Sequence, residues 1–308
     1  MSIDIQVSFL PNVAEIDRVF RSMGSQKDNT CGPYNLTCLL RGMGFTSHNG
    51  NELDEDYLGS LASTNILVED EEISEAIKRK LKLGILTREQ VDSHFREVVY
   101  KYELPTTSQE SELGTSIQGL VDACTEATDR KITALPLPSV GKNRKELFTQ
   151  ERLLQLLRLV FDNKDRWGAH ALLNYRADRL LNMNSPEYTF FDVLTHFDDE
   201  RRFGYDPWHV GHFVTLAGLI KDVKSDRCAL LIRDAYKNKG FRGYHIQPFE
   251  AVRRALIRDD GREGGILLLV KSEFSGEASN ALEGLGLVIS AWDNGSPYRP
   301  NVLQRPSC

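Results

Sequence analysis

A cysteine stands at the start of an apolar, helix-like run in the stretch KDNTCGPYNLTCLLRGMGF, residues 27–45. Cys31 precedes Gly32 and Pro33, and proline fits the first turn of a helix, where no backbone N–H is needed. The partial positive charge at a helix N-terminus favours a thiolate, the nucleophilic form of cysteine. Most free cysteines are small buried hydrophobes, so a catalytic role for Cys31 depends on finding a base.

The best candidate for that base is His212, one of seven histidines. It opens the apolar run HFVTLAGLI, residues 212–220, which we expect to be a buried strand. The next expected strand, CALLIRD, ends at Asp234. In an antiparallel pair the start of one strand lies beside the end of the next, so His212 and Asp234 are expected to be close in space. A carboxylate bonded to the imidazole would fix its tautomer and stabilise its cation, although Asp234 alone would be read as a turn residue.

These residues, in this order and context, resemble the papain-like cysteine peptidase superfamily. The likeness is to the branch typified by bacteriocin-leader (double-glycine) peptidases, and it covers residues 26–45 and 210–250. It is carried by TCGPYNL and by GHFVTLAGL followed by LLIRDAY. The resemblance implies that Cys31 is the nucleophile, His212 the base and Asp234 the acid that orients the base.

The resemblance also implies an oxyanion hole, to which a glutamine a few residues before the nucleophile usually contributes. Gln26 is the match, with Asn29 as the alternative. The chain departs from the family pattern at Tyr34, where a small residue is usual, and at Ala235, where proline is usual. The residues expected to line a substrate cleft are Gly32, Tyr34, Trp208 and Gly211.

The predicted function is hydrolysis of a peptide or amide bond through a thioester, without a cofactor. Two alternatives stay open: an acyltransferase or deamidase that uses the same three residues, and a papain-like binding module without catalysis. A zinc hydrolase is disfavoured. Asp206, His209 and His212 could ligate a metal, but on a strand residues i and i+3 point to opposite faces.

Composition narrows the partners and the compartment. The 308 residues carry a net charge of −6, and Lys and Arg form no long blocks, so no nucleic-acid partner is expected. No signal peptide and no membrane-spanning run are recognisable, which predicts a cytoplasmic protein without a membrane partner. The resemblance implies a peptide or protein substrate. Five scattered cysteines predict no disulfide framework, with Cys38 and Cys228 buried and Cys308 exposed. The identity of the substrate and the oligomeric state stay open.

Hydrophobic periodicity predicts an α+β fold. The resemblance implies that this fold is of the papain-like type. A helical N-terminal half, including the nucleophile helix, would pack on a mostly antiparallel sheet in the C-terminal half. We expect one domain over residues 1–295, with a helical insertion at about 50–165 and a flexible tail at 296–308. The Pro- and Gly-containing stretch 135–143 is expected to break regular structure, and a helix is expected to follow at 144–163.

Overall fold

The computed structural model describes residues 4–182, 204–224 and 227–300. The chain divides into two compact units, which we describe one at a time. Unit 1 comprises residues 1–15 and 131–294, and unit 2 comprises residues 16–130 and 295–308. The α+β class is confirmed, with a mostly antiparallel sheet in the C-terminal half. Among the helices of the described residues, none is long and apolar enough to cross a membrane.

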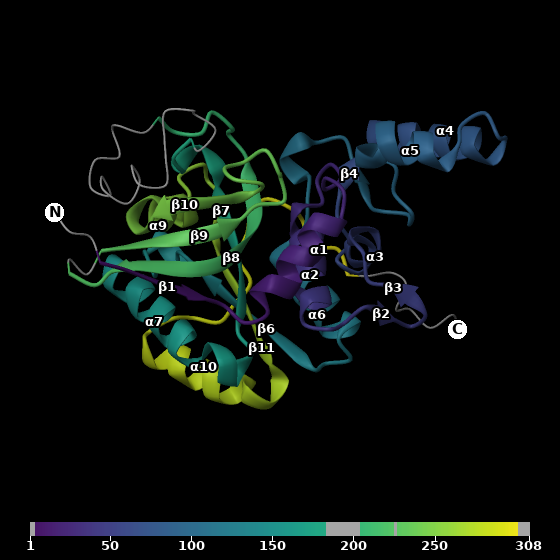
Figure 1. Cartoon of the computed structure of the whole chain (residues 1–308). Helices are drawn as coiled ribbons and strands as arrows, with labels where there is room; N and C mark the ends of the chain where they lie inside the picture. Colours follow the sequence, from purple (N-terminus) through teal and green to yellow (C-terminus); the bar gives the residue numbers. More distant parts are fainter. Residues whose placement is uncertain (1–3, 183–203, 225–226, 301–308) are drawn as a thin grey trace. The chain divides into compact units, whose positions relative to one another are not determined.

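Seven antiparallel strands form the main sheet of unit 1, in the order β10-β9-β8-β7-β11-β6, with β1 added beside β8. Figure 1 shows purple β1 lying along green β8, although the two are far apart in sequence. The strands expected at 212–220 and 228–234 are confirmed. The observed bounds are β1 Ile5–Phe9, β6 Ile132–Pro138, β7 His170–Arg176, β8 Gly211–Asp222, β9 Cys228–Arg233, β10 Tyr244–Pro248 and β11 Gly265–Lys271.

The stretch expected to break regular structure contains a strand instead. β6 pairs along its whole length with β11, so that Pro136 lies opposite Leu267 and Pro138 opposite Gly265. β6 is the last strand in the sheet order and has one neighbour in the sheet. Proline is tolerated on such an edge strand because its missing N–H can face away from the neighbour. The prediction was therefore wrong because the two prolines were read as a loop signal.

Three helices pack on the sheet of unit 1: α7 Gln150–Trp167, α9 Phe249–Ile257 and α10 Ser275–Gly284. In α7 the leucines at 153, 156 and 157 recur at helical spacing and enter the main apolar cluster with strand residues. Thr149 caps the helix by accepting a hydrogen bond from the Arg152 N–H, and Gly168 ends it in a left-handed conformation. The helix expected at 144–163 therefore begins and ends later than predicted.

His170, at the start of β7, gives unit 1 a pH-dependent stability. Its side chain is buried, and the loss of hydration lowers its pKa to about 4 from 6.5. Between these values the unfolded chain binds a proton that the folded chain does not, so the free energy of unfolding falls as the pH drops from about 6.5 to about 4. We expect the free energy of unfolding of wild type to fall by about 2–3 kcal/mol more than that of His170→Gln between pH 7 and pH 4.5.

Urea unfolding of both proteins at the two pH values measures this difference. The matched control is His94→Gln, because His94 is exposed on a helix of unit 2. It should keep the wild-type pH dependence. A wild-type slope that persists in His170→Gln would show that other groups cause it.

Unit 2 is built mainly from helices. Its helices are α1 Val13–Ser22, which begins in the last residues assigned to unit 1, α2 Cys31–Gly42, α3 Glu55–Leu61, α4 Val68–Lys82, α5 Arg88–His94 and α6 Ile117–Ala127. Two small ribbons accompany them: β2 Ser47–His48 with β3 Asn51–Glu52, and β4 Ile66–Leu67 with β5 Thr106–Thr107. α2 packs against α3 and α6. The helical character predicted for the N-terminal half is confirmed in these residues.

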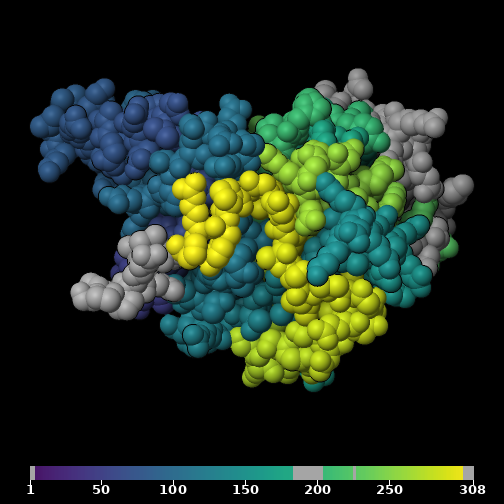
Figure 2. All heavy atoms as spheres, turned by 180° about the vertical axis from the view of Figure 1, so that it is seen from behind, coloured from purple at the N-terminus to yellow at the C-terminus, as the bar shows by residue number. Residues whose placement is uncertain are grey.

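The residues that follow unit 1 at the C-terminus return to unit 2. The Ser296 hydroxyl donates a hydrogen bond to the Leu113 carbonyl oxygen at 2.6 Å, and the Tyr298 hydroxyl donates to Asp122 at 2.7 Å. In the space-filling view, yellow residues near the end of the chain lie on the surface (Figure 2). These contacts hold the described part of the predicted tail, residues 296–300, on unit 2.

Candidate functional site

His212 and Asp234 form a buried pair in unit 1, as predicted. His212 Nε2 lies 2.9 Å from Asp234 Oδ1, and the two residues are 1% and 2% exposed. The antiparallel pairing of β8 with β9 brings them together, since Thr215 lies opposite Arg233 and each strand extends from there toward the site. Alternation along the two strands places both side chains on the face of the sheet that α7, α9 and α10 cover.

The Asp234 carboxylate is held by several donors. Its Oδ1 also accepts a hydrogen bond from the Tyr236 N–H at 2.9 Å, and its own N–H donates to the Gly243 carbonyl oxygen at 2.7 Å. Burial acts to raise the pKa of Asp234, but the charges and hydrogen bonds of His212 and His245 outweigh burial and hold the pKa well below its usual range. Asp234 therefore stays ionised across the neutral pH range, as a group that orients an imidazole must.

Aromatic rings surround the His212 imidazole. The ring of Trp208 lies 5.1 Å from it, Tyr236 lies 5.5 Å away and Tyr175 of β7 lies 6.2 Å away with its ring edge-on. These rings keep water from much of the imidazole, which strengthens its interaction with Asp234. Gly211 begins β8 next to His212, and the Arg258 guanidinium packs over it where a larger residue would place a Cβ.

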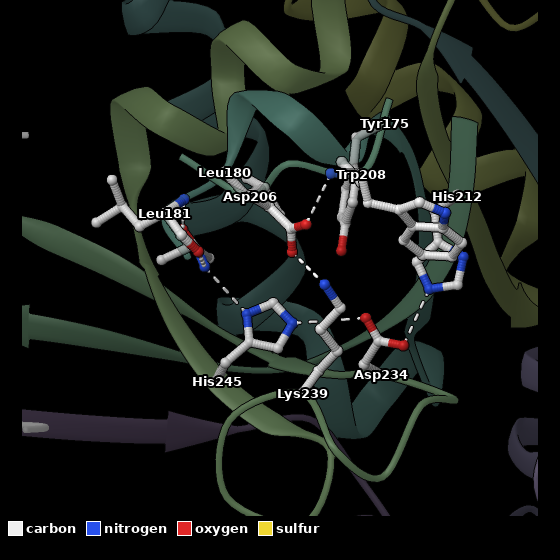
Figure 3. Close-up of a pocket in the computed structure, with 11 residues that line it drawn as sticks. Tyr175, Leu180, Leu181, Asp206, Trp208, His212, Asp234, Lys239 and His245 are labelled. Carbon is white, nitrogen blue, oxygen red and sulfur yellow. Dashed lines mark hydrogen bonds and ion pairs between the residues drawn. The ribbon is translucent and has the colours of Figure 1, made fainter. Parts of the chain in front are cut away.

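A small cavity borders this pair, with room for about one water molecule (about 20 Å³). Figure 3 shows the Asp234 carboxylate between the imidazoles of His212 and His245, with Lys239 beside them. Lys239 forms an ion pair with Asp206, and its ammonium group lies 5.5 Å from the centre of the Trp208 ring. His245 and Lys239 were missed in the sequence, although the alternation in YHIQP could have placed His245 and Gln247 on one face of a strand.

Cys31 lies in unit 2, whereas His212 and Asp234 lie in unit 1. It is the first residue of α2, and Pro33 occupies the third position of the helix. The N–H groups in the first turn of a helix have no partner within the helix, and they carry the positive end of its dipole. The Cys31 side chain is partly exposed, whereas Cys38, Cys124 and Cys228 are buried. Cys308 lies outside the described residues.

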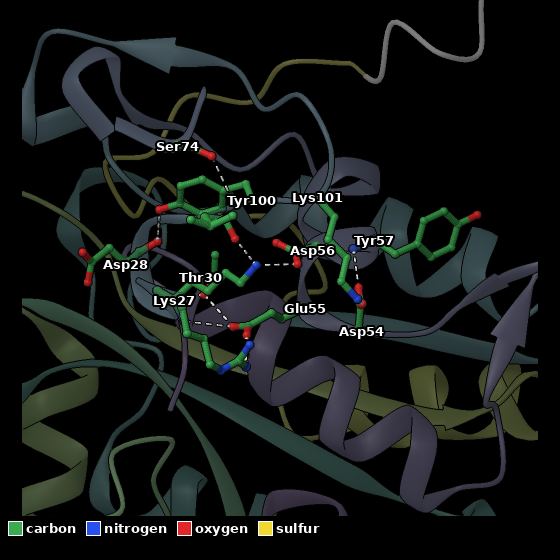
Figure 4. Close-up of polar contacts among 12 residues, drawn as sticks. Lys27, Asp28, Thr30, Asp54, Glu55, Asp56, Tyr57, Ser74, Tyr100 and Lys101 are labelled. Carbon is green, nitrogen blue, oxygen red and sulfur yellow. Dashed lines mark hydrogen bonds and ion pairs between the residues drawn. The ribbon is translucent and has the colours of Figure 1, made fainter. Parts of the chain in front are cut away.

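A buried ionic cluster holds the loop that leads to Cys31 (Figure 4). The Lys27 ammonium group pairs with Asp56 at 2.5 Å, and the Lys27 backbone N–H donates to Glu55 Oε2 at 3.0 Å. The Thr30 hydroxyl donates to the Lys27 carbonyl oxygen at 2.7 Å and lies 3.0 Å from the same Glu55 oxygen. Burial raises the pKa of Glu55 against the lowering effect of Arg96, with which it forms an ion pair. The loop is therefore fixed by side chains from α3 and beyond.

The other residues predicted near the nucleophile differ in their surroundings. Gln26 is buried at the start of the same loop, and Asn29 adopts a left-handed backbone with φ 62°. Tyr34 is fully buried; its hydroxyl donates to the Gly24 carbonyl oxygen at 2.9 Å and its ring packs 5.8 Å from Phe20. Gly32 is buried in the first turn of α2. The contacts of Tyr34 are those of a core residue of unit 2.

The three residues considered as zinc ligands have separate partners. Asp206 pairs with Lys239, His212 pairs with Asp234, and His209 Nδ1 lies 2.7 Å from Asp178. In the part of the chain that the structure describes, no group of three or more His, Cys, Asp or Glu residues is arranged to hold a metal ion.

Comparison with known proteins gives a family without an assigned activity. No curated protein sequence matches the chain. The model of a family of unknown function, DUF6885, matches residues 10–293, which is most of both units. The chain therefore belongs to the family of unknown function DUF6885.

Proposed function

We propose that this protein is a thiol hydrolase with a papain-like active site, acting on a peptide or amide bond of a peptide or protein substrate. Cys31 is the nucleophile, His212 the general base and then general acid, and Asp234 the residue that orients His212. The resemblance of the residues around Cys31, His212 and Asp234 to papain-like peptidases supports the assignment of these roles.

The observation that carries the proposal is the buried hydrogen bond between His212 and Asp234, at 2.9 Å. A carboxylate at this distance fixes one tautomer of the imidazole and stabilises its cation. Because Nε2 faces Asp234, the proton exchange with the thiol is assigned to Nδ1. Burying this pair at the start of an apolar strand removes water from both polar groups at a cost in free energy. A role in proton transfer would explain why the chain bears that cost.

The proposed reaction has two steps. His212 takes the Cys31 thiol proton, the sulfur attacks the carbonyl carbon, and His212 passes the proton to the departing amine as the thioester forms. A water molecule then attacks the thioester carbonyl and His212 takes a proton from it. The C–S bond breaks, His212 returns the proton to the Cys31 sulfur, and a carboxylic acid is released. The Cys31 backbone N–H and the Gln26 amide are the proposed donors to the oxyanion, each worth about 10²–10³-fold in rate.

The test is the rate at which iodoacetamide alkylates each cysteine as a function of pH, read by peptide mass spectrometry. We expect Cys31 to react fastest below pH 7, because an imidazolium partner holds the sulfur as a thiolate. An ordinary thiol is less than about 1% thiolate at pH 6, so His212→Ala should slow Cys31 there by about 10²-fold.

The chain supplies its own controls. The buried Cys38, Cys124 and Cys228 should be protected, and burial raises the pKa of Cys124 to about 12. His209→Ala removes an exposed imidazole three residues before His212 and should leave the profile unchanged. If Cys31 reacts no faster than an unfolded thiol, or is protected in wild type and variant alike, the proposal is wrong.

A further inference from the structure

A second imidazole approaches the carboxylate that holds His212. His245 Nε2 lies 3.8 Å from Asp234 Oδ2, while His212 Nε2 lies 2.9 Å from Oδ1, so Asp234 stands between two rings (Figure 3). His245 is buried, with 6% of its surface exposed. A distance of 3.8 Å is longer than a hydrogen bond, so His245 acts on the carboxylate through its charge distribution. His245 has no role in the proposed reaction.

The orientation of His245 is fixed by Gln247. The Gln247 side-chain oxygen accepts a hydrogen bond from the Leu181 N–H at 2.9 Å, and its nitrogen donates to the Leu181 carbonyl oxygen at 3.0 Å. These two bonds determine which end of the amide is the nitrogen. The second N–H of that nitrogen points to His245 Nδ1, 3.2 Å away. Nδ1 is therefore an acceptor, and in the neutral ring the proton lies on Nε2, facing Asp234.

The sheet builds this arrangement. In the β9–β10 pairing His245 lies opposite Ile232 and Gln247 opposite Leu230, so their side chains share the face on which Asp234 lies two residues further on. The loop that connects β9 to β10 holds the start of β10 close to Asp234, which directly follows β9. A Cβ on Gly240, which has φ +57°, would lie 2.8 Å from His245 Cβ, and one on Gly243 would lie 2.8 Å from the Asp234 carbonyl oxygen. Both positions therefore need glycine.

We propose that His245 is a positioning residue for the thiol chemistry, with Gln247 as its support. Its Nε2–H restrains the Asp234 carboxylate and takes up part of its negative charge, which limits how strongly Asp234 stabilises the His212 imidazolium. This inference rests on the proposed function, because it assigns His245 to the reaction of which His212 is the base. Its physical content, an effect of His245 on the titration of His212, can be measured without that reaction.

Other groups that titrate or carry charge also face these rings, and all of them remain in the variants compared below. They come from the loop before β10, from β7 and from the segment before β8: Tyr236, Lys239, Tyr175 and Asp206. The Arg258 guanidinium packs over Gly211, the neighbour of His212 in the chain. Because these groups are unchanged, a difference in His212 titration between variants at His245 is assigned to the effect of His245 on Asp234.

The experiment is histidine-selective NMR on the full chain, with His212→Asn used to assign the His212 signals. In wild type we expect the proton of neutral His245 to lie on Nε2 and not on Nδ1. This expectation can be tested on the wild-type protein alone. In His245→Leu the titration midpoint of His212 should rise by on the order of half a unit to one unit, because Asp234 keeps its full charge for His212. The His212 midpoint should rise in this variant whether His245 is neutral or protonated in wild type.

His245→Gln is the conservative variant, because its amide N–H can occupy the place of Nε2–H and face the Asp234 carboxylate. It should return the midpoint most of the way to the wild-type value, which a purely structural role for His245 would not produce. A proton on Nδ1 in wild type, or an unchanged His212 midpoint in a folded His245→Leu protein, would overturn the inference.

The same variants separate this inference from the proposed function. If the His212 midpoint moves and the pH profile of Cys31 alkylation moves with it, both stand. If the midpoint moves but Cys31 alkylation is indifferent to His212→Ala and to His245→Leu, the thiol reaction is refuted and His245 has no catalytic partner to position. The influence of His245 on His212 would then hold as a property of unit 1 alone.

Discussion

Cys31→Ala is expected to abolish acyl transfer from an activated ester to the protein. Incubation with p-nitrophenyl esters of N-acylated amino acids should give wild type one acyl group on Cys31, visible by intact mass and peptide mapping, with a burst of nitrophenolate. The variant should lose the adduct and the burst, because alanine has no atom that can attack the carbonyl. A loss on the order of 10⁴–10⁶-fold is typical when the nucleophile of a concerted group of residues is removed.

Cys38→Ala is the matched control for this prediction. Cys38 belongs to the same helix but is fully buried, so its thiol takes no part in the reaction. The control should keep the burst and the adduct on Cys31. An adduct that persists in Cys31→Ala at the wild-type rate would refute the role of Cys31, and mapping of that adduct would identify the residue responsible.

The His212–Asp234 pair could be located from the sequence because its two residues lie at adjacent ends of two consecutive strands. Two apolar runs joined by a short turn predict an antiparallel pair, and antiparallel geometry alone brings the start of one strand beside the end of the next. The pair was then found at 2.9 Å. No long-range packing had to be guessed, since both residues belong to neighbouring strands of one sheet.

The elements that were missed lacked such a signal. β10 is five residues long and ends in proline, and its first residues follow a glycine-containing loop, so no strand was predicted there. β6 carries two prolines, which are tolerated because it is an edge strand. A single sequence does not indicate which strand will lie at the edge of the sheet. His245 and Gln247 were missed for this reason, because residues on an unrecognised strand cannot be assigned to a face of the sheet.

The ionic cluster around the loop before Cys31 could not be predicted at all. Lys27 meets Asp56 and the carbonyl oxygen of Val99, and these partners are distant in sequence. Charged residues in unit 2 are numerous, and most lie in solvent. Only tertiary packing decides which lysine loses its hydration, so a sequence gives no reason to choose Lys27 over its neighbours.

Lys27→Met is expected to lower the stability of unit 2 by about 3–5 kcal/mol, the cost of leaving a buried partner charge unpaired. The Lys27 and Asp56 side chains are only 4% and 3% exposed, and the Lys27 ammonium group also lies 5.6 Å from the centre of the Tyr100 ring. Methionine matches the length of lysine and fills the space, so the change removes the charge with little change in packing. Urea unfolding, followed by a probe confined to unit 2, measures the effect.

Lys78→Met is the matched control. Lys78 Nζ lies 2.7 Å from Glu75 Oε1, a distance close to the 2.5 Å of the buried pair, but these side chains are 32% and 56% exposed. Solvent screens that pair, so its loss should change the stability by less than about 0.5 kcal/mol. Similar losses in the two variants would show that distance, and not burial, sets the energy of these pairs.

The double variant Lys27→Met with Asp56→Leu separates the pair's net contribution from the cost of an orphaned charge. If the large loss in Lys27→Met arises from the unpaired Asp56 carboxylate, removing that carboxylate should recover much of the stability, because apolar replacements of buried ion pairs are often tolerated. The double variant should nevertheless loosen the loop before Cys31, since Lys27 also bonds to the Val99 carbonyl oxygen. Faster hydrogen exchange at residues 26–30 in a protein of near-normal stability would show that the Lys27 contacts hold the loop before Cys31 in place. Unchanged exchange would show that the bonds of Glu55 and Thr30 are sufficient to hold it.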